Sequence, residues 1–389
     1  MSTSKSGKAT QMNNQANPHP GPAEAVAAPQ QGTPQQATPP GPWQQNGYLP
    51  QQPYLPEPGP QPVAVEDRRA AESDPGQELT RDMLFRPTKR PPASGWRRVL
   101  HRLTGVNPGE APEDVRRREL AERVCQPIRG DYKIALLSLK GGVGKTTTTV
   151  ALGSTFASLR GDHVVAIDAN PDLGTLGGRI PSQTAATVRD LLDDAERIRR
   201  YSDVRAFTSQ APSRLEVLAS ERDPHKAESF SEEDYRGAVG ILENFYTLIL
   251  TDCGTGLTHS AMRGVLDTAD ALVLISSPAL DGARSASATL DWLDAQGYGH
   301  LVQRTAVVIS MTRPGSSGVN MSQLVEHFDA RVRAVRVLPF DSHLAEGSEV
   351  DLERMSSSAR DAFTELAALV ADDFPAAAGR HHGPMPARP

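Results

Sequence analysis

Cysteine is scarce in this chain. Only Cys125 and Cys253 occur among the 389 residues, and they stand far apart in different sequence contexts. Small secreted scaffolds depend on several paired cysteines, so this count excludes a disulfide framework. The simplest interpretation is a reduced, cytoplasmic protein.

The chain also lacks a long apolar segment and a strong excess of either charge. No run of about 18 apolar residues, the length that a membrane-spanning helix requires, occurs in it. The N-terminus has no apolar core of a signal peptide either. We therefore expect that the chain neither crosses a membrane nor enters the secretory route unaided. The net charge of −6 provides no overall attraction to nucleic acid, so a nucleic-acid partner is not indicated.

Hydrophobic residues are few, and the deficit is concentrated at the N-terminal end. They make up 38% of the chain, and aromatic residues 5%. Residues 1–65 consist mainly of Pro, Gln, Ala and Asn, with almost no Val, Ile or Leu. Such a composition cannot bury enough apolar surface to offset the entropy of ordering. We predict a disordered Pro/Gln-rich tail over 1–65 and a second disordered tail over 376–389.

Residues 66–130 are predicted to form a charged linker that contains one basic amphipathic helix near 95–105. Apolar residues recur there at helical spacing, with arginines on the other face; the apolar positions are Trp96, Val99, Leu100 and Leu103. Two interpretations stay open. The helix either lies on the anionic inner face of the plasma membrane as a peripheral contact, or it packs against the rest of the chain or a partner protein. A mixed-charge helix around 116–120 is expected to be solvated.

Strands and helices alternate over residues 131–375, which predicts one α/β domain with a mostly parallel, twisted sheet covered by helices on both faces. The predicted strands are 134–139, 163–168, 215–219, 245–252, 271–276 and 305–311. The predicted helices are 148–159, 188–198, 281–295, 360–374 and one that begins at a capping box formed by Ser231 and Asp234.

A glycine-rich segment, residues 140–147, connects the first strand to the first helix. This order of strand, glycine loop and helix is what a phosphate-binding loop requires. A glycine turn with nearby surface lysines is the alternative, but the number of matching residues favours the loop. The backbone N–H groups of Gly141, Gly142, Val143 and Gly144, together with Thr147, would surround the phosphates of ATP. Lys145 would neutralise the β- and γ-phosphates, and the Thr146 hydroxyl would be a ligand for Mg²⁺.

The segment departs from the ordinary pattern, because Leu139 stands where a glycine is usual and a second lysine, Lys140, precedes the glycines. In this respect it resembles the deviant phosphate loop of the ParA/MinD family of P-loop ATPases. The resemblance implies a P-loop NTPase fold and an ATP-dependent homodimer. It also implies that Lys140 reaches the phosphates of the nucleotide held by the opposite subunit.

Three polar residues follow predicted strands and complete the site that the resemblance implies. Asp168 would support the Mg²⁺ ion or its waters, and Asp252 would be the Walker-B residue that holds a Mg²⁺-bound water. Asn170 stands where most relatives carry a second acid that positions the attacking water. An amide orients water but cannot accept its proton, so slow hydrolysis is expected. Whether Asp172 replaces the missing acid stays open.

Two positions are candidates for contact with adenine. Relatives commonly have an asparagine at the end of the strand that corresponds to 305–311, where this chain has Met311, Thr312 and Arg313. Base recognition is therefore assigned either to Arg313 or to the loop 337–341, which contains Pro339.

Finer features are similar to the MinD-like ATPases of actinobacteria, some of which are linked to type VII secretion. They are the segments 168–172 and 338–344 and the long Pro/Gln-rich front. The resemblance implies a slowly hydrolysing, dimerising ATPase, stimulated by a protein partner, that positions or regulates a cellular machine. That machine would serve partitioning, division-site placement or secretion. A hydrolysis-deficient, ATP-binding scaffold is the alternative. A metabolic or redox member of the superfamily is disfavoured, because cluster-bearing relatives need paired cysteines.

Overall fold

The computed structural model describes residues 111–170, 174–221, 230–315 and 319–374. Both predicted disordered tails, the basic helix near 95–105 and Asp172 lie outside the described residues. Among the described helices, none combines the length and apolar character that crossing a membrane requires.

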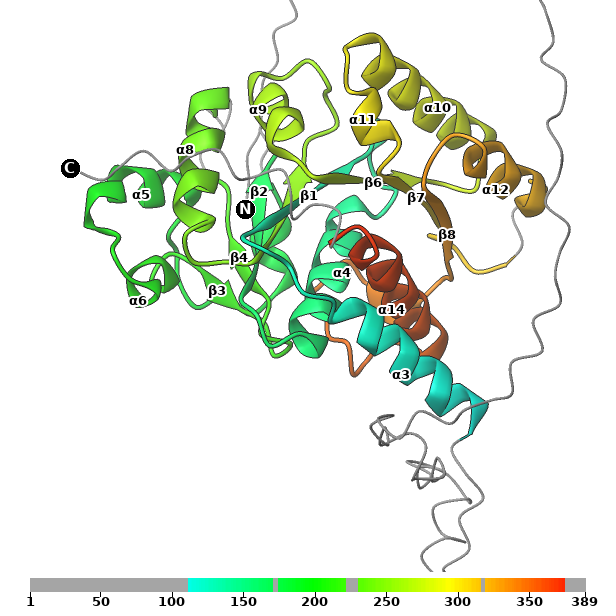
Figure 1. The fold of residues 1–389 in the computed structure, drawn as a ribbon, viewed down its shortest axis with the longest axis horizontal. Coiled ribbons are helices and arrows are strands. Elements are labelled where there is room, and N and C mark those ends of the chain that lie inside the picture. The colour runs from blue at the N-terminus through cyan, green and yellow to red at the C-terminus, as the bar shows by residue number, and fades with distance from the viewer. Residues whose placement is uncertain (1–110, 171–173, 222–229, 316–318, 375–389) are drawn as a thin grey trace, which may run out of the picture. The chain divides into compact units, whose positions relative to one another are not determined.

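Eight strands of the described chain form one sheet, in the order β3-β4-β2-β5-β1-β6-β7-β8 (Figure 1). All neighbouring strands pair in parallel except β3 and β4, which are antiparallel. The prediction of a mostly parallel sheet is thus confirmed. The strands are β1 (Tyr132–Leu137), β2 (Val164–Ala169), β3 (Ser209–Gln210), β4 (Glu216–Leu218), β5 (Leu248–Cys253), β6 (Ala271–Ser276), β7 (Thr305–Ser310) and β8 (Ala334–Leu338).

Helices cover both faces of the sheet. On one face lie α4 (Lys145–Leu159), α14 (Ser357–Ala371) and α3 (Pro112–Val124). The other face is covered by α5 (Val188–Asp193), α6 (Tyr201–Arg205), α8 (Glu232–Leu242), α9 (Ser260–Thr268), α10 (Leu280–Ala295), α11 (Gly299–Val302) and α12 (Met321–Asp329). Short α13 (Ser342–Ala345) and the 3₁₀ turns η1 (Leu176–Arg179) and η2 (Ala195–Arg197) lie in connecting segments.

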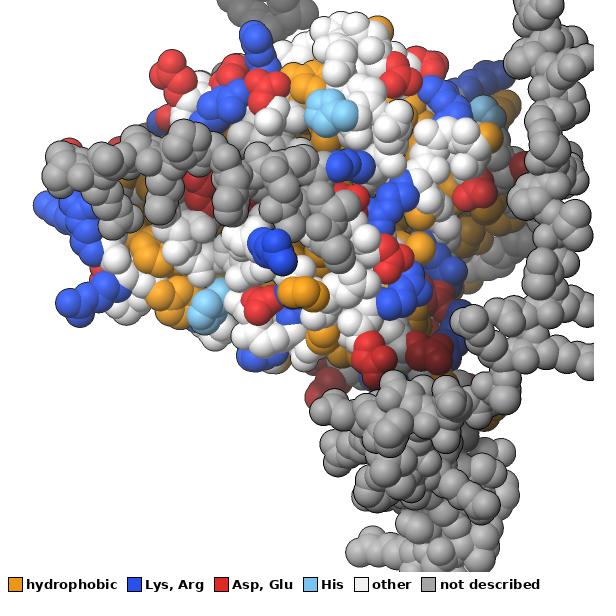
Figure 2. All heavy atoms as spheres, in the orientation of Figure 1, with side chains coloured by type: hydrophobic (Ala, Val, Ile, Leu, Met, Phe, Trp, Pro, Cys, Tyr) orange, Lys and Arg blue, Asp and Glu red, His pale blue; other side chains and the backbone are white. Residues whose placement is uncertain are grey.

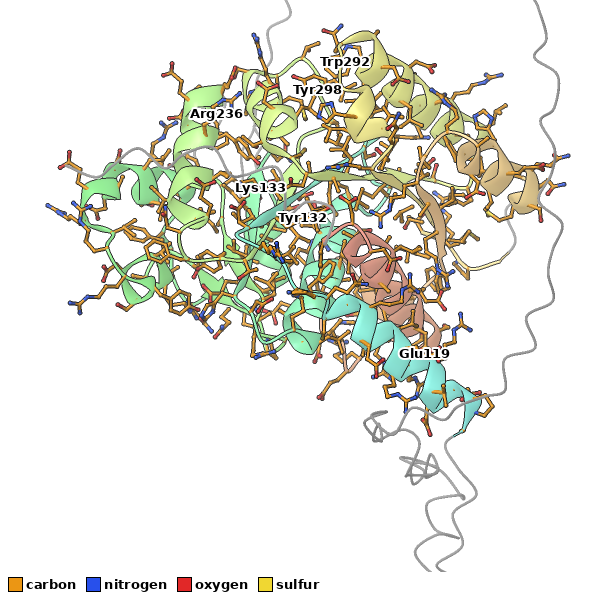
Figure 3. The ribbon with its side chains drawn as sticks, viewed as in Figure 1. Glu119, Tyr132, Lys133, Arg236, Trp292 and Tyr298 are labelled. Carbon is orange, nitrogen blue, oxygen red and sulfur yellow. The ribbon has the colours of Figure 1, made fainter. Side chains whose placement is uncertain are left out.

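The central strands are apolar throughout because each of them contributes to two hydrophobic cores. In β1, Ile134 and Leu136 face the core under α4 and α14, whereas Ala135 and Leu137 face the opposite core. Tyr132, at the start of this strand (Figure 3), donates a hydrogen bond of 2.8 Å from its hydroxyl to Asp373 after α14. Its ring also packs edge-on against Phe374, with 4.7 Å between ring centroids. The amino end of β1 is thereby fixed, and the opposite end carries the phosphate loop.

Helix α3 falls within the segment 66–130 that was predicted to be a linker, yet it packs on α14 (Figure 1). Leu120 and Val124 are buried in the core, and Arg123 forms an ion pair of 2.6 Å with Asp372. The expectation of a solvated helix is therefore wrong for one of its faces. A few apolar residues among many charges gave too weak a periodic signal. The acids that pair with the arginines of this helix lie about 250 residues later in the chain.

The predicted helix 188–198 is also shorter than expected. It ends at Asp193, and the chain turns at Asp194 into η2. Two consecutive aspartates at a helix C-terminus oppose the helix dipole, and the Asp194 carboxylate instead pairs with Arg197 at 2.7 Å. The capping box predicted at the start of α8 is confirmed. Ser231 Oγ accepts from the Asp234 N–H at 3.1 Å, and the Asp234 carboxylate accepts from the Ser231 N–H at 2.9 Å.

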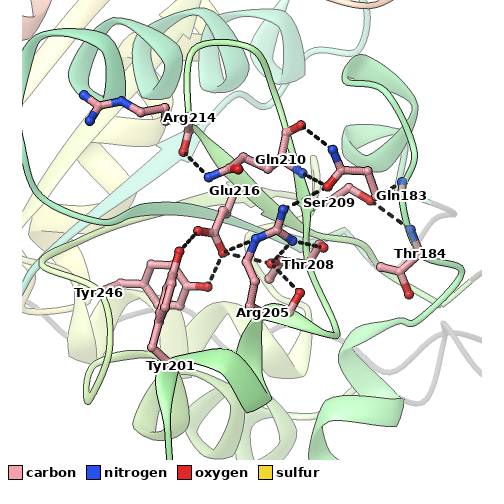
Figure 4. A network of polar contacts seen from close by, with 10 residues as sticks. All are labelled: Gln183, Thr184, Tyr201, Arg205, Thr208, Ser209, Gln210, Arg214, Glu216 and Tyr246. Atoms are coloured by element: carbon pink, nitrogen blue, oxygen red, sulfur yellow. Dashed lines mark hydrogen bonds and ion pairs between the residues drawn. The ribbon is translucent and has the colours of Figure 1, made fainter.

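A buried polar cluster lies at β4, the strand next to the edge strand β3 (Figure 4). Its centre is Glu216, whose side chain is almost completely buried. The hydroxyls of Tyr201 and Tyr246 donate to this carboxylate, as does that of Thr208 at 2.8 Å, and the Arg205 Nε lies 3.8 Å away. The ring of His163 stacks on that of Tyr201, with 4.0 Å between centroids. We call this set the Glu216 cluster.

Candidate functional site

The glycine-rich segment turns sharply between β1 and α4. Gly142 and Gly144 have φ angles of 73° and 90°, in the left-handed region that residues with a Cβ seldom adopt. A Cβ at Gly144 would also approach the Ser310 hydroxyl to 3.3 Å. Helix α4 begins directly afterwards at Lys145, so its free N–H groups face the turn. The structure thus has the strand, loop and helix order that the sequence predicts.

Lys145, Thr146 and Asp252 converge at the start of α4. The Lys145 Nζ lies 2.6 Å from Asp252 Oδ1, and the Thr146 hydroxyl donates to Asp252 Oδ2 at 2.6 Å. Thr149, one turn further along the helix, donates to Oδ1 at 3.2 Å. Asp252 is fully buried and Lys145 is only 9% exposed, so their charges interact with little screening by water. Sequence reasoning missed Thr149, which is recognisable only as the residue one helical turn after Lys145.

The donor set fits a magnesium ion that is held mainly by water and phosphate. A carboxylate and a hydroxyl stand next to each other, and both are oxygen ligands of the kind that Mg²⁺ prefers. Within the described ranges, no cluster of three or more His, Cys, Asp and Glu side chains could hold a metal ion by itself. The protein would therefore supply few ligands, as is usual for magnesium bound together with a nucleotide.

Asp168 lies beside Asp252, because these two residues are partners in the β2–β5 register. Burial, followed by the negative charge of Asp252, raises the pKa of Asp168 to about 7. The N–H groups of Asn170 and Leu176 donate to its carboxylate at 3.1 and 3.0 Å. A Cβ at Gly174 would lie only 2.0 Å from Asp168 Oδ2, so only glycine fits there. Asp168 therefore anchors the loop that follows β2.

Asn170 stands directly after β2, on that same loop. With Asp168, Arg189 and Phe230 it lines a small cavity of about 10 Å³, the space of roughly one water molecule. Asp168 in β2 and Asn170, two positions later, thus line one cavity, with Asp252 beside Asp168 on strand β5.

Lys140 does not point toward its own phosphate loop. Its ammonium group forms an ion pair with Asp281, in the first turn of α10, and its side chain is 43% exposed. The hydrogen bond from Lys140 holds the pKa of Asp281 below its ordinary value. Sequence reasoning missed Asp281, since the two residues are 141 positions apart and neither pattern indicates the other.

Beside the loop lies a cavity of about 310 Å³, which we call the base cavity. Its walls include Gly144 and Thr147 on one side and Pro339 and Phe340 on the other. The volume is in the range of small-molecule sites. Arg313 lies elsewhere, in a neighbouring cavity of about 520 Å³ that Lys140 and Asp281 also line. The structure therefore separates the two predicted adenine contacts and brings only Pro339 next to the base cavity.

Asp341 and His343 fix the loop that carries Pro339. The Asp341 carboxylate accepts hydrogen bonds from the N–H groups of Leu344 at 3.1 Å and Ser356 at 2.8 Å. Burial would raise the pKa of Asp341, but these backbone hydrogen bonds outweigh it and lower the pKa. His343 Nε2 accepts from the Asp351 N–H at 2.9 Å. Pro339 and Phe340, which form one wall of the base cavity, thus lie on a segment with a fixed backbone.

Residues 134–354 match the family described as the CobQ/CobB/MinD/ParA nucleotide binding domain. The chain belongs to this family. The match begins in β1 and includes the phosphate loop, both aspartates and the loop with Pro339, so it covers every part of the site described above. Membership of the ParA/MinD group confirms the family resemblance that the deviant loop indicates.

The chain is similar to known proteins of two kinds. It is 40% identical over 288 residues to the ESX-1 secretion-associated protein EspI of Mycobacterium tuberculosis. That match covers 74% of this chain but only 43% of EspI. The septum site-determining protein MinD of Synechocystis is 26% identical over 54% of this chain and 77% of its own length.

The solved structure of a ParA family ATPase from Chlorobium tepidum shares the fold, with a TM-score of 0.52 and 19% identity. It covers 61% of this chain and 98% of its own. Together with the parallel sheet and the phosphate loop, this likeness establishes a P-loop NTPase fold of the ParA/MinD type.

Proposed function

We propose that this protein is an ATP-dependent switch that binds Mg·ATP, dimerises around the nucleotide and hydrolyses it slowly. The observation that carries the proposal is the position of Lys140. Lys145 already supplies a buried cation at the Asp252 carboxylate, whereas Lys140 is half-exposed and directed at α10. A second lysine with this orientation is suited to the phosphates of a nucleotide in another subunit. Charges of both signs are mixed over the face shown in Figure 2, which favours a protein partner over nucleic acid.

In this proposal each side chain of the site has one task. Lys145 and the loop N–H groups bind the phosphates, and Thr146, Asp168 and Asp252 hold Mg²⁺ and its waters. Bound magnesium would neutralise charge on the β- and γ-phosphates. Pro339 contacts the base, and Arg313 borders the cavity that contains Lys140. Asn170 orients a water toward the γ-phosphorus, but its amide cannot take the proton of that water. Turnover is therefore slow until a partner protein intervenes.

The first experiment measures the molar mass of the protein by light scattering, with and without a slowly hydrolysed ATP analogue. We expect a dimer for the parent with the analogue and a monomer for Lys140→Ala under the same conditions. Arg360→Ala, which removes an exposed charge from α14, is the matched control and should dimerise. A monomer in every condition would contradict the dimer switch.

Hydrolysis decides between the switch and its alternative, a hydrolysis-deficient scaffold that Asn170 favours. Phosphate release should be slow for the parent and faster for Asn170→Asp, because a general base typically contributes a factor of roughly 10²–10⁴. If Asn170→Asp is no faster, the missing carboxylate is not the limiting feature. A parent that releases no phosphate even in extract of its native cells would establish the scaffold.

Among the cellular machines, the similarity to a secretion-associated relative favours a secretion system over partitioning or division. A pull-down from native cells, with and without ATP, tests this choice, and Lys145→Ala is the nucleotide-free control. ATP-dependent recovery of secretion components supports the proposal, and recovery of division or partition proteins instead would refute it.

Peripheral membrane contact through 95–105 stays a prediction. Deleting these residues should abolish sedimentation with anionic liposomes, and added salt should weaken sedimentation of the parent. A parent that never sediments with liposomes would leave protein docking as the role of this segment.

A further inference from the structure

The base cavity is lined by a positively charged side chain that belongs neither to the phosphate loop nor to the Walker-B strand. Arg179, the last residue of η1, lines this cavity on the side of α13. Its backbone oxygen accepts a hydrogen bond of 2.8 Å from the Val350 N–H, which ties η1 to the segment after α13. The backbone of Arg179 is thus held by a contact that does not use the guanidinium group.

One end of that guanidinium group has no hydrogen-bond partner in the described part of the chain. Its Nη1 atom is buried and unpaired. A Cβ at Gly347 would lie 3.5 Å from Nη1, so the group is packed closely against the Gly347 backbone. Leaving a buried N–H group unpaired is unfavourable, and the unfavourable term is larger for a charged group.

Asp341, the acid that lines the same cavity, forms no ion pair with Arg179. Its two carboxylate oxygens already accept the N–H groups of Leu344 and Ser356. None of the ion pairs found among the described residues includes Arg179. The cavity therefore presents a donor-only, planar cation next to the apolar wall formed by Pro339 and Phe340.

These surroundings match the nucleoside half of a nucleotide better than its terminal phosphates. A base and a ribose offer flat surface and ring-nitrogen or hydroxyl acceptors, which suit an apolar wall and a guanidinium group. Lys145, Thr146 and Asp252, which form the phosphate and magnesium end of the site, do not line this cavity.

We propose that Arg179 is a nucleotide-binding residue that donates hydrogen bonds to the base or ribose of the bound nucleotide. The proposal rests on the proposed function, since it requires nucleotide in this cavity. It adds a third element, η1, to the loop and the Pro339 segment that hold the ligand. Binding would offer acceptors to the guanidinium group and so join the end of the loop that follows β2 to the base side of the site.

The test compares the affinities of ATP, ADP and inorganic tripolyphosphate by calorimetry for the parent, Arg179→Met and Arg179→Lys. Tripolyphosphate carries the phosphates without a nucleoside. Arg179→Met should weaken ATP and ADP alike by roughly 10- to 100-fold, the effect of losing a charged hydrogen bond. Its affinity for tripolyphosphate should stay the same. Arg354→Met is the control, because Arg354 is exposed and pairs with Glu346 on the surface near α13.

The outcomes separate this proposal from the proposed function. Parent-like ATP affinity in Arg179→Met overturns the role of Arg179 and leaves the ATPase intact. Equal losses for ATP and tripolyphosphate show a phosphate contact and also overturn it. Failure of the parent to bind ATP overturns both. If Arg179→Met does not fold, Arg179→Lys decides: it keeps the charge but not the planar fork, and ATP affinity several-fold below the parent's is expected.

Discussion

Two buried acidic sites lie on the same sheet, and they are built in opposite ways. In the Glu216 cluster, one carboxylate is surrounded by three hydroxyl donors with an arginine nearby, so its acceptors are satisfied within the protein. Beside the phosphate loop, Asp168 and Asp252 lie next to each other with Lys145 as the buried cation. A complete cluster stabilises the fold, whereas an excess of negative charge beside a cavity is suited to a cation that arrives with a ligand.

The largest effect is expected at Asp168 and Asp252, the two carboxylates beside the phosphate loop. Asp252→Ala should reduce phosphate release by a factor on the order of 10³, because the variant loses a preorganised electrostatic contact in a buried site. The rate at saturating ATP, compared with that of the surface control Asp361→Ala, tests this expectation. Parent-like turnover in Asp252→Ala would mean that the carboxylate that holds magnesium lies elsewhere, and the comparison would fail.

The next effect concerns stability at the complete cluster. Glu216→Ala leaves the hydroxyls of Thr208 and Tyr246 buried without their acceptor, and should lower the free energy of unfolding by about 3 kcal/mol. Urea unfolding measures the difference, with the exposed Glu349→Ala as control. Nucleotide affinity should remain at the parent value. A variant as stable as its control would show that the cluster is not structural.

The pH dependence of stability is a further test of the difference between the two sites. The pKa of Asp168 is about 7 in the folded protein against an ordinary value of 3.8, so the folded state binds this proton more tightly than the unfolded chain. The stabilisation that comes from this tighter proton binding is complete below about pH 4, and it is lost as the pH rises through about 7. Asp168→Asn should remove this dependence and be more stable than the parent above pH 7, by an amount on the order of 1–3 kcal/mol. Parallel pH profiles for the two proteins would rule out the raised pKa.

The smallest effect is expected at the exposed ion pair of Lys140. Asp281→Asn releases this lysine, so the dimer should form at a concentration of ATP analogue lower by about two- to fivefold, the range of a surface ion pair. Light scattering over an analogue titration measures the shift. A higher required concentration would mean that Asp281 assists Lys140 in the dimer instead of competing for it.

The sequence predicted those parts of the molecule that depend on local patterns. The strand at 271–276 has the same bounds in the structure, because its apolar run is bounded by Asp270 on one side and by Ser277 and Pro278 on the other. The phosphate loop was predictable for a similar reason, since its glycines and Lys145 follow one another directly. The alternation of strands and helices along the chain was sufficient to predict the parallel sheet.

The parts that could not be predicted depend on contacts between distant residues. Nothing near Arg116 or Arg123 indicates that acids on α14 and just after it will pair with them, so α3 was assigned to a linker. Arg179 and Asp281 come close to the site because η1 follows β2 and α10 follows β6, and these parallel strands have their carboxyl ends at the same edge of the sheet. The two-residue strand β3 exists through its antiparallel pairing with β4 and has no pattern of its own.

The attachment of α3 also has a mechanical consequence. Helix α3 opens the described part of the chain and is fastened to α14 by Leu120, Val124 and its arginines. Helix α14 in turn packs on α4, the helix that begins at the phosphate loop. A force applied to α3 would therefore reach the start of the phosphate loop through two packed helices, α14 and α4.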